Sequence, residues 1–408
     1  MWKTLIRAAP IVAIFFLWGL GTGSQQLARP LFAFSFGVPI FLVTLIESSN
    51  ALARIISAPT TGFLSDKFGR KPLVVGGILL RGVTTFIEFY AASYLAFLVL
   101  EFIGGIGVAM WATSSQILIA DVAGERNRGR MVALRSVSSR AGMAIGPVIG
   151  GFLATLFSIR AAILFNGITK IFVLVITVFL IRETRPQANK ANRVRAPGEV
   201  GSLHYKLFLT RTFIAVAIAT VAFSMMAEGV YKALMPLYAQ EDLSLSASDI
   251  GKLMGIGGLL AIATSLPNGF LMDRIGRKIS LIPGLILLGL ASYLLGTSTS
   301  FQALILVAIV YGIAESMTRD STQVFAIDMA PEDKRGTFLG IWFLLTHAGG
   351  FIVPLAIGFV AELYGFQIAF LSVAVLLWIS GGLVIIMAKE VRRMMASTAE
   401  EETNFSQD

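Results

Sequence analysis

Residues 62–71 read GFLSDKFGRK, a short run of glycine and charge between two long apolar stretches. The same pattern returns 207 residues later, where residues 269–278 read GFLMDRIGRK. The chain has 408 residues, so the two copies lie half a chain apart. This spacing predicts two structurally equivalent halves, each carrying one copy of the motif.

The composition indicates a membrane protein. Hydrophobic residues make up 56% of the chain and charged residues only 14%, whereas a soluble domain carries about a quarter charged residues. A chain this apolar cannot cover its surface with polar groups, so most of that surface must face lipid. The chain has no cysteine, which excludes disulfides, thiolate metal sites and cysteine nucleophiles.

Twelve apolar runs are long enough to cross a bilayer as helices, which takes about 20 residues each. Strands are not expected, because backbone polar groups in lipid must be satisfied within the segment. The runs lie near residues 8–33, 40–63, 72–91, 94–120, 133–157, 160–181, 212–238, 249–271, 279–297, 301–328, 337–361 and 366–388. The predicted fold is an all-α integral membrane protein with 12 transmembrane helices in two pseudo-symmetric six-helix bundles.

Basic residues gather in alternate connections between these runs. Those in even-numbered connections are Lys67, Arg70, Lys71, Arg126, Arg128, Arg130, Arg274, Arg277, Lys278, Lys334 and Arg335. In the odd-numbered connections only Arg160, at the edge of a run, is basic. Cytoplasmic loops carry the excess of lysine and arginine, so both termini and the even-numbered connections are expected in the cytoplasm. The short loops suit a multi-pass protein of the cell (inner, or cytoplasmic) membrane.

The repeat extends beyond the two motifs and sets the domain boundaries. At the same offset of 207, Asp121 matches Asp328 and Pro147 matches Pro354. The halves therefore have the same orientation, as in a parallel repeat about an axis along the membrane normal. The predicted organisation is a bundle at 1–182, a basic cytoplasmic linker at 183–210, a second bundle at 211–390 and a cytoplasmic tail at 391–408.

The paired motif and the twelve-helix plan resemble the major facilitator superfamily. The residues that carry the resemblance are Gly62, Asp66, Gly69, Arg70 and Lys71, with Gly269, Asp273, Gly276, Arg277 and Lys278 in the second half. The resemblance covers nearly the whole chain. It implies a secondary active transporter that works by alternating access.

Two further stretches refine the resemblance. Gly142, Gly146, Pro147, Gly150 and Gly151 are similar to the fifth-helix signature of the drug:proton antiporter branch. That similarity implies proton-coupled efflux of amphipathic compounds. Where the fourth helix of the family often has an arginine linked to proton coupling, this chain has Glu101, with the opposite charge.

The motif residues suggest a latch between the halves. Asp66 follows the second run, where a carboxylate can accept from the free N–H groups of a facing helix and meet its positive end. The facing helix is expected to be the run 337–361, and Gly62 is expected to let the two backbones approach. The resemblance implies that this latch holds the cytoplasmic side closed and breaks when the carrier opens inward.

Ion pairs within each half are expected to support the latch. Arg70 is expected to pair with Asp121, and Arg277 with Asp328, while Asp273 faces the run 133–157. The latch residues are Gly62, Asp66, Gly69, Arg70, Lys71, Asp121, Gly269, Asp273, Gly276, Arg277, Lys278 and Asp328.

Ionisable residues inside the runs mark candidate sites, because each costs at least about 2.5 kcal/mol at the bilayer centre. They are Glu47, Arg54, Arg81, Glu88, Glu101, Arg135, Arg140, Lys170, Glu228, Lys232, Glu315, Arg319 and Asp320. Spacings of four residues predict Glu228–Lys232 and Glu315–Arg319 ion pairs. Spacings of seven place Glu47 with Arg54, and Arg81 with Glu88, on one helix face, and predict buried structural pairs. Lys170 is expected to pair with an acid such as Glu88.

In the resembled family the first, fourth, seventh and tenth helices line the central cavity. The residues expected there are Gln25, Gln26, Arg29, Glu101, Trp111, Gln116, Glu228, Tyr231, Lys232, Glu315, Arg319 and Asp320. Glu228 beside Lys232 is the first candidate for the proton carrier, followed by Glu101 and Glu315. Trp111 and Tyr231 are expected either to pack in the core or to stack on an aromatic or hydrophobic substrate.

Two substrate classes stay open. The fifth-helix signature favours proton-coupled efflux of amphipathic compounds. The seven basic and six acidic residues inside the runs favour an organic anion or a zwitterionic metabolite, taken up or exported. A receptor on this fold, binding without transport, is a third reading. The sequence holds no nucleophile–base pair, metal cluster or phosphate loop, so no enzyme, metal or cofactor is expected, and the protein is expected to be a monomer.

Overall fold

The computed structural model describes residues 2–181, 183, 208, 210–331 and 335–390. Within those ranges the side chains of residues 2–8, 66, 120–130 and 335–337 are not described. Most of the predicted linker at 183–210, the tail at 391–408, and the side chains of Asp66 and Asp121 therefore lie outside the described part of the chain. In the described part, twelve helices are long and apolar enough to cross a membrane, and the predicted all-α fold is confirmed.

The helices of the first half match the predicted runs to within a few residues. They are α1 (Trp2–Phe34), α2 (Ile40–Phe68), α3 (Arg70–Phe89), α4 (Tyr94–Leu156) and α5 (Ile159–Leu180). Helix α4 carries two of the predicted spans, Tyr94–Ile119 and Met131–Leu156.

The second half repeats the plan with one irregular span. Its helices are α6 (Arg211–Ser224), the π-helical segment η3 (Met225–Leu234), α7 (Met235–Glu241), α8 (Ala247–Ile275), α9 (Lys278–Thr297), α10 (Phe301–Met329), α11 (Arg335–Tyr364) and α12 (Phe366–Met387). Together α6, η3 and α7 form a single span, Arg211–Glu241.

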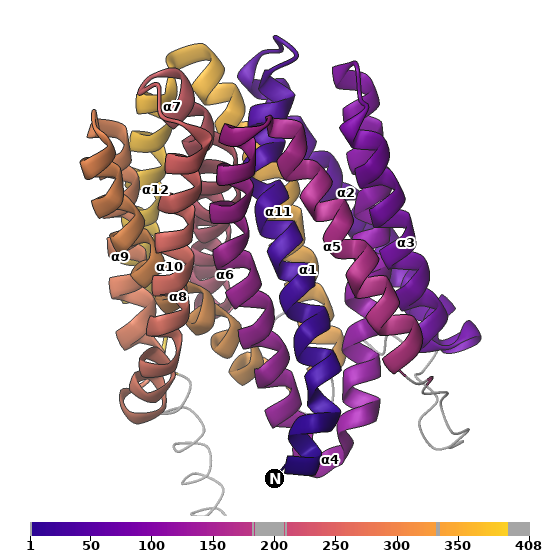
Figure 1. Cartoon of the computed structure of the whole chain (residues 1–408). Coiled ribbons are helices and arrows are strands. Elements are labelled where there is room, and N and C mark those ends of the chain that lie inside the picture. Colours follow the sequence, from indigo (N-terminus) through magenta and orange to yellow (C-terminus); the bar gives the residue numbers. More distant parts are fainter. Residues whose placement is uncertain (1, 182, 184–207, 209, 332–334, 391–408) are drawn as a thin grey trace, which may run out of the picture.

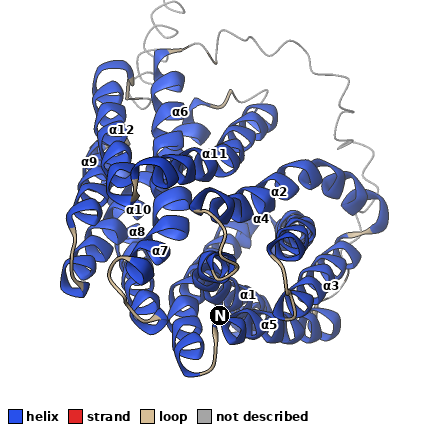
Figure 2. Cartoon of the chain, turned by 90° about the horizontal axis from the view of Figure 1, so that it is seen from above, coloured by secondary structure: helices blue, strands red, loops and turns tan. Residues whose placement is uncertain are grey.

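The two halves stand side by side. Figure 1 shows α8, α9, α10 and α12 grouped on one side and α2, α3 and α5 on the other. Seen from above, α11 of the second half lies beside α2 of the first half (Figure 2). These two helices are in contact, as are α4 and α8. We call the side of the bundle that carries residues 62–71 and 269–278 the motif side.

The halves are packed tightly on the side opposite the motifs. A Cβ added at Gly151 of α4 would clash with the carbonyl oxygen of Ala247, where α8 begins. A Cβ added at Gly358 of α11 would clash with the Thr44 side chain of α2. The backbone N–H of Ile40 donates to Glu362 Oε2 at 2.6 Å. The absence of side chains at these glycines lets the helices touch, and this side is closed.

The motif side is open. A cavity of about 380 Å³ lies between α4 and α8, with Arg140, Gly269 and Asp273 on its wall. Among the described residues, a Cβ added at Gly62 or Gly269 would meet nothing within 4 Å. The predicted close backbone approach at Gly62 is therefore wrong for this conformation, because the halves are separated there.

The motif instead braces helices within each half. Gly69 has φ +103° and Gly276 φ +130°, a region that favours glycine, and each ends one helix just before the next. The N–H of Arg70 donates to Glu183 at 2.9 Å, and the N–H of Arg277 to Glu390 at 2.9 Å. Each carboxylate thus satisfies free donors at a helix N-terminus.

Candidate functional site

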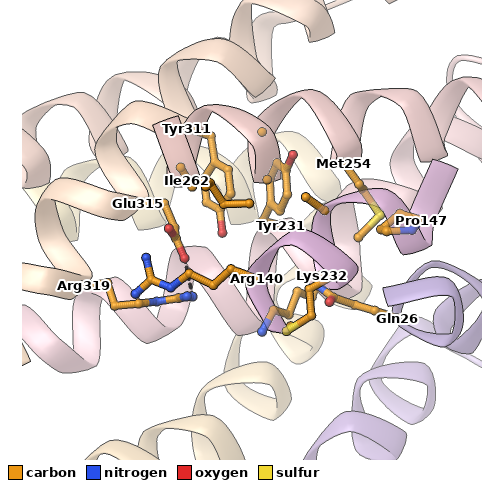
Figure 3. A pocket seen from close by; sticks show the side chains of 15 residues that line it. Gln26, Arg140, Pro147, Tyr231, Lys232, Met254, Ile262, Tyr311, Glu315 and Arg319 are labelled. Carbon is orange, nitrogen blue, oxygen red and sulfur yellow. Dashed lines mark ion pairs between the residues drawn. The ribbon is translucent and has the colours of Figure 1, made fainter. Parts of the chain in front are cut away.

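Two adjoining cavities lie between the halves. The first, of about 90 Å³, is lined by Tyr231, Lys232, Met254, Tyr311, Glu315 and Arg319, with Gln26, Arg140, Met143 and Pro147 from the first half. We call it the tyrosine cavity (Figure 3). The second, of about 120 Å³, is lined by Gln25, Arg29, Glu47, Arg54, Arg81, Lys170 and Glu228 among others. We call it the charged cavity. Gln26, Met143 and Lys232 line both, so the two cavities share a wall.

The tyrosine cavity has aromatic and apolar walls with one ion pair. The rings of Tyr231 and Tyr311 stack with their centroids 3.6 Å apart. The Tyr231 hydroxyl donates to the Leu253 carbonyl at 3.2 Å. The predicted Glu315–Arg319 ion pair is present and lies beside Tyr311 (Figure 3). An apolar or aromatic group fits such walls, with the carboxylate–guanidinium pair at its edge.

The irregular span presents three of the predicted residues to these cavities. Glu228, Tyr231 and Lys232 all lie in the π-helical segment η3. Lys232 Nζ donates to Glu228 Oε1 at 2.6 Å, as the four-residue spacing predicted. The Glu228 side chain is 34% exposed, so this pair is accessible from the charged cavity. Single-turn π-helical bulges are frequent at functional sites.

A network of ion pairs supports the charged cavity. Arg29 contacts Glu47 at 2.6 Å and Glu101 at 3.0 Å. Arg81 contacts Glu101 at 3.2 Å and Glu88 at 3.1 Å, so the predicted Arg81–Glu88 pair is present. The five residues come from α1, α2, α3 and α4, and the network joins these helices.

Glu101 is the centre of this network. It is fully buried, and besides Arg29 and Arg81 it accepts from Gln25 Nε2 at 2.7 Å and Asn50 Nδ2 at 3.0 Å. Four donor side chains on one carboxylate hold it in place. Its described contacts are those of a structural anchor below the cavity wall.

Two of the predicted pairings are wrong. Glu47 pairs with Arg29 rather than with Arg54, because α1 brings Arg29 within 2.6 Å of it. Lys170 does not pair with Glu88. Its Nζ donates to the Trp18 carbonyl at 3.2 Å and lies 4.1 Å from the centre of a Trp18 ring.

Besides Glu101, three more of the predicted cavity residues lie away from the cavity walls. Trp111 is buried and stacks on Trp18 at 3.7 Å, so it packs in the core. Gln116 is exposed and lines neither cavity. Asp320 lies behind the wall, where it pairs with Arg140 at 3.0 Å.

The structure describes the side chains of some of the predicted latch residues. Arg277 Nε contacts Asp328 at 2.8 Å, the pair that the sequence predicted. Asp273 is 79% exposed on the open motif side. A Cβ at Gly142 or Gly146 would clash with α1, so these glycines allow close packing inside the first half.

Some residues of the site were not singled out from the sequence. Tyr311 and Asn50 carry no pattern that distinguishes them from core residues. Glu183 and Glu390 do carry a signal, because they are separated by the same 207 residues as the motifs that they cap.

Comparison with known proteins supports the resemblance. A family model described as Major Facilitator Superfamily matches residues 11–231 and residues 217–406. An uncharacterised MFS-type transporter of Methanocaldococcus jannaschii is 26% identical over 346 residues, 85% of this chain and 89% of the relative. Quinolone resistance protein NorA of Staphylococcus aureus is 23% identical over 382 residues, 93% of this chain and 95% of the relative. A solved D-xylose–proton symporter shares the fold, with TM-score 0.77, 16% identity and coverage of 95% and 98%.

Proposed function

Because this chain belongs to the major facilitator superfamily and is a multi-pass membrane transporter of that family, we propose that it exports amphipathic small molecules in exchange for protons. The export works by alternating access of the two joined cavities. The orientation proposed from the basic loops puts the motif side in the cytoplasm. The conformation described above is then open to the cytoplasm and ready to take up a substrate for export.

The observation that carries the proposal is the pairing of two unlike cavities between the halves. One has stacked tyrosines and apolar walls, and the other has charged walls. A molecule with an apolar body and a polar head matches both parts at once. The closed packing at Gly151 and the open cavity at Asp273 are the asymmetry that alternating access needs.

Two further points support export and coupling. The relative from Staphylococcus aureus is named for quinolone resistance, and the glycines around Pro147 resemble the antiporter signature. Glu228 is a suitable proton carrier, because it faces the charged cavity and its described ion pair is with Lys232 on the same helical segment. A proton on Glu228 would release Lys232 and change the charge of the cavity.

A second candidate is transport of an organic anion or a zwitterionic metabolite, in either direction. The charge of the walls favours it. The cations that line the charged cavity are Arg29, Arg54, Arg81, Lys170 and Lys232, against the acids Glu47 and Glu228. The tyrosine cavity adds Arg140 and Arg319 against Glu315.

Transport by purified protein in liposomes tests these proposals. With a proton gradient across the membrane, we expect uphill movement of an amphipathic dye or of an organic anion, and loss of uphill movement in Glu228→Gln. Glu241→Gln is the matched control, because Glu241 is exposed and its described contact is with neighbouring Gln240. Failure of the wild type to move any of these compounds would overturn the proposed function. Equal proton-driven movement by wild type and Glu228→Gln would overturn the assignment of the carrier.

A further inference from the structure

Two cations of the charged cavity differ from the others. Arg29, Arg81 and Lys232 each contact a carboxylate. For Arg54 of α2 and Lys170 of α5, no ion pair with a described acid is found. Both side chains line the same cavity of about 120 Å³.

The guanidinium of Arg54 is incompletely satisfied. Its Nε is buried and has no hydrogen-bond partner in the described part of the chain. Leaving a buried donor without a partner destabilises the protein, and more so when the group is charged. Buried polar groups in native proteins are nearly always hydrogen-bonded, so this donor is available to a ligand that enters the cavity.

Lys170 is the second unpaired cation. It is only 2% exposed, and its ammonium bonds one carbonyl oxygen, of Trp18, and more loosely the hydroxyl of Thr22 at 3.5 Å. The face of the Trp18 ring covers it from another side. These neighbours orient the amino group, and none of them is a carboxylate.

The charged cavity has more basic residues than acidic partners for them. Its walls carry five basic residues. Glu47 and Glu228 on the walls, with Glu88 and Glu101 behind them, supply four carboxylates, so the basic groups outnumber these acids by one. Buried charges are stable only when they are paired, and a single carboxylate would complete the pairing.

We infer that Arg54 and Lys170 form a binding site for the carboxylate of the substrate. This inference rests on the proposed function and deepens it, since it makes the transported molecule an amphipathic acid or zwitterion. The carboxylate lies in the charged cavity, where an arginine can bind both of its oxygens. The apolar body passes Gln26 and Lys232, which line both cavities, and lies beside Tyr231 and Tyr311.

Binding to the purified full-length chain tests the site. The probes are 2-naphthoate, the uncharged 2-naphthamide of the same shape, acetate and chloride, measured by calorimetry. We expect the naphthoate to bind at least roughly tenfold tighter than the amide, because a hydrogen bond to a charged group is worth about one such factor. Arg54→Gln and Lys170→Met should each weaken naphthoate binding by a similar factor and leave amide binding unchanged. Arg54→Lys should keep part of the affinity.

Arg135→Gln is the matched control. It removes a cation from the same helix bundle, but Arg135 stacks on Phe15 and lines neither cavity. Because Lys170→Met also loses the hydrogen bonds to Trp18 and Thr22, its melting temperature is measured beside its binding.

Other outcomes would also overturn it. Equal binding of naphthoate and naphthamide, no binding of naphthoate, or undiminished binding by Arg54→Gln would exclude a carboxylate site. Displacement of naphthoate by chloride as readily as by acetate would show a site for inorganic anions instead. If these binding results fail while the wild type still exports a cationic dye, only the carboxylate site is wrong. If naphthoate binds as expected and no compound is moved, the proposed function is wrong and the site remains.

Discussion

Arg140 and Asp320 form an ion pair of 3.0 Å that joins the two halves, one from the second span of α4 and the other from α10. The hydroxyl of Ser265 on α8 also donates to Asp320, at 2.7 Å. Arg140 lines both the tyrosine cavity and the open cavity on the motif side. The pair therefore lies between the candidate substrate site and the open side of the molecule.

Breaking this pair should make the tyrosine cavity easier to reach from the motif side. The chain has no cysteine, so a single reporter, Met254→Cys on the cavity wall, can be labelled without background. We expect Arg140→Gln and Asp320→Asn each to raise the rate of labelling by a charged thiol reagent several-fold. The loss of an ion pair between the halves removes one restraint on their separation.

The double variant tests whether Arg140 and Asp320 affect labelling through their ion pair or independently of each other. If the two side chains act through each other, Arg140→Gln with Asp320→Asn should label no faster than either single variant, since coupled residues are not additive. Unchanged labelling in all three variants would mean that the pair does not restrict access to the cavity.

Side chains added where the two halves touch should open the side of the molecule opposite the motifs. Gly151→Ala places a methyl group against the Ala247 carbonyl on the closed side, so it should disfavour this conformation. We expect greater labelling of cavity cysteines from the side opposite the motifs and slower transport. Gly382→Ala on α12 is the control, because a Cβ there meets nothing within 4 Å in the described part of the chain. Equal behaviour of the two variants would show that the Gly151 contact does not hold this side closed.

The sequence was most informative where the interacting residues are close together or repeated. Run length predicted the spans, and four-residue spacing predicted the Glu228–Lys232 contact. The partner of Glu47 could not be predicted in this way. Spacing fixes the face of a helix on which a side chain lies, but packing decides which neighbouring helix meets that face. Thus Arg29, 18 residues earlier on α1, takes the place that the pattern gave to Arg54.

The carboxylates that cap α3 and α9 should contribute equally to stability, because they repeat at the offset of the motifs. Glu390 accepts from the N–H groups of Arg277 and Lys278, and Glu183 from those of Arg70 and Lys71. Loss of a capping acceptor costs about 1 kcal/mol. We expect Glu183→Ala and Glu390→Ala each to lower the melting temperature in detergent, and the double variant to lower it further. Glu241→Ala should have no effect, and a wild-type melting temperature for both single variants would exclude a stabilising cap.

Substitutions of Glu101 and of Glu228 should affect different properties. We expect Glu101→Gln to lower the stability of the fold and Glu228→Gln to remove the coupling of transport to protons. Glu101→Gln leaves the buried guanidinium groups of Arg29 and Arg81 without their shared carboxylate, and breaking a buried pair costs about 3–5 kcal/mol. We expect this variant to fold poorly, as measured by yield and melting temperature. Glu228→Gln loses one contact, to Lys232 in a partly exposed pair, so it should fold normally and still exchange substrate across the membrane without a proton gradient.

The decisive measurement compares two activities in the same liposomes: uphill transport driven by a proton gradient, and exchange of substrate without a gradient. A proton carrier is needed only for uphill movement, so Glu228→Gln should lose that movement and keep exchange. If Glu315→Gln loses uphill movement and Glu228→Gln does not, the proton carrier is Glu315, which pairs with Arg319 in the tyrosine cavity. A well-folded Glu101→Gln that transports normally would contradict its role as the anchor, because the four donor side chains would then have lost their carboxylate at no cost.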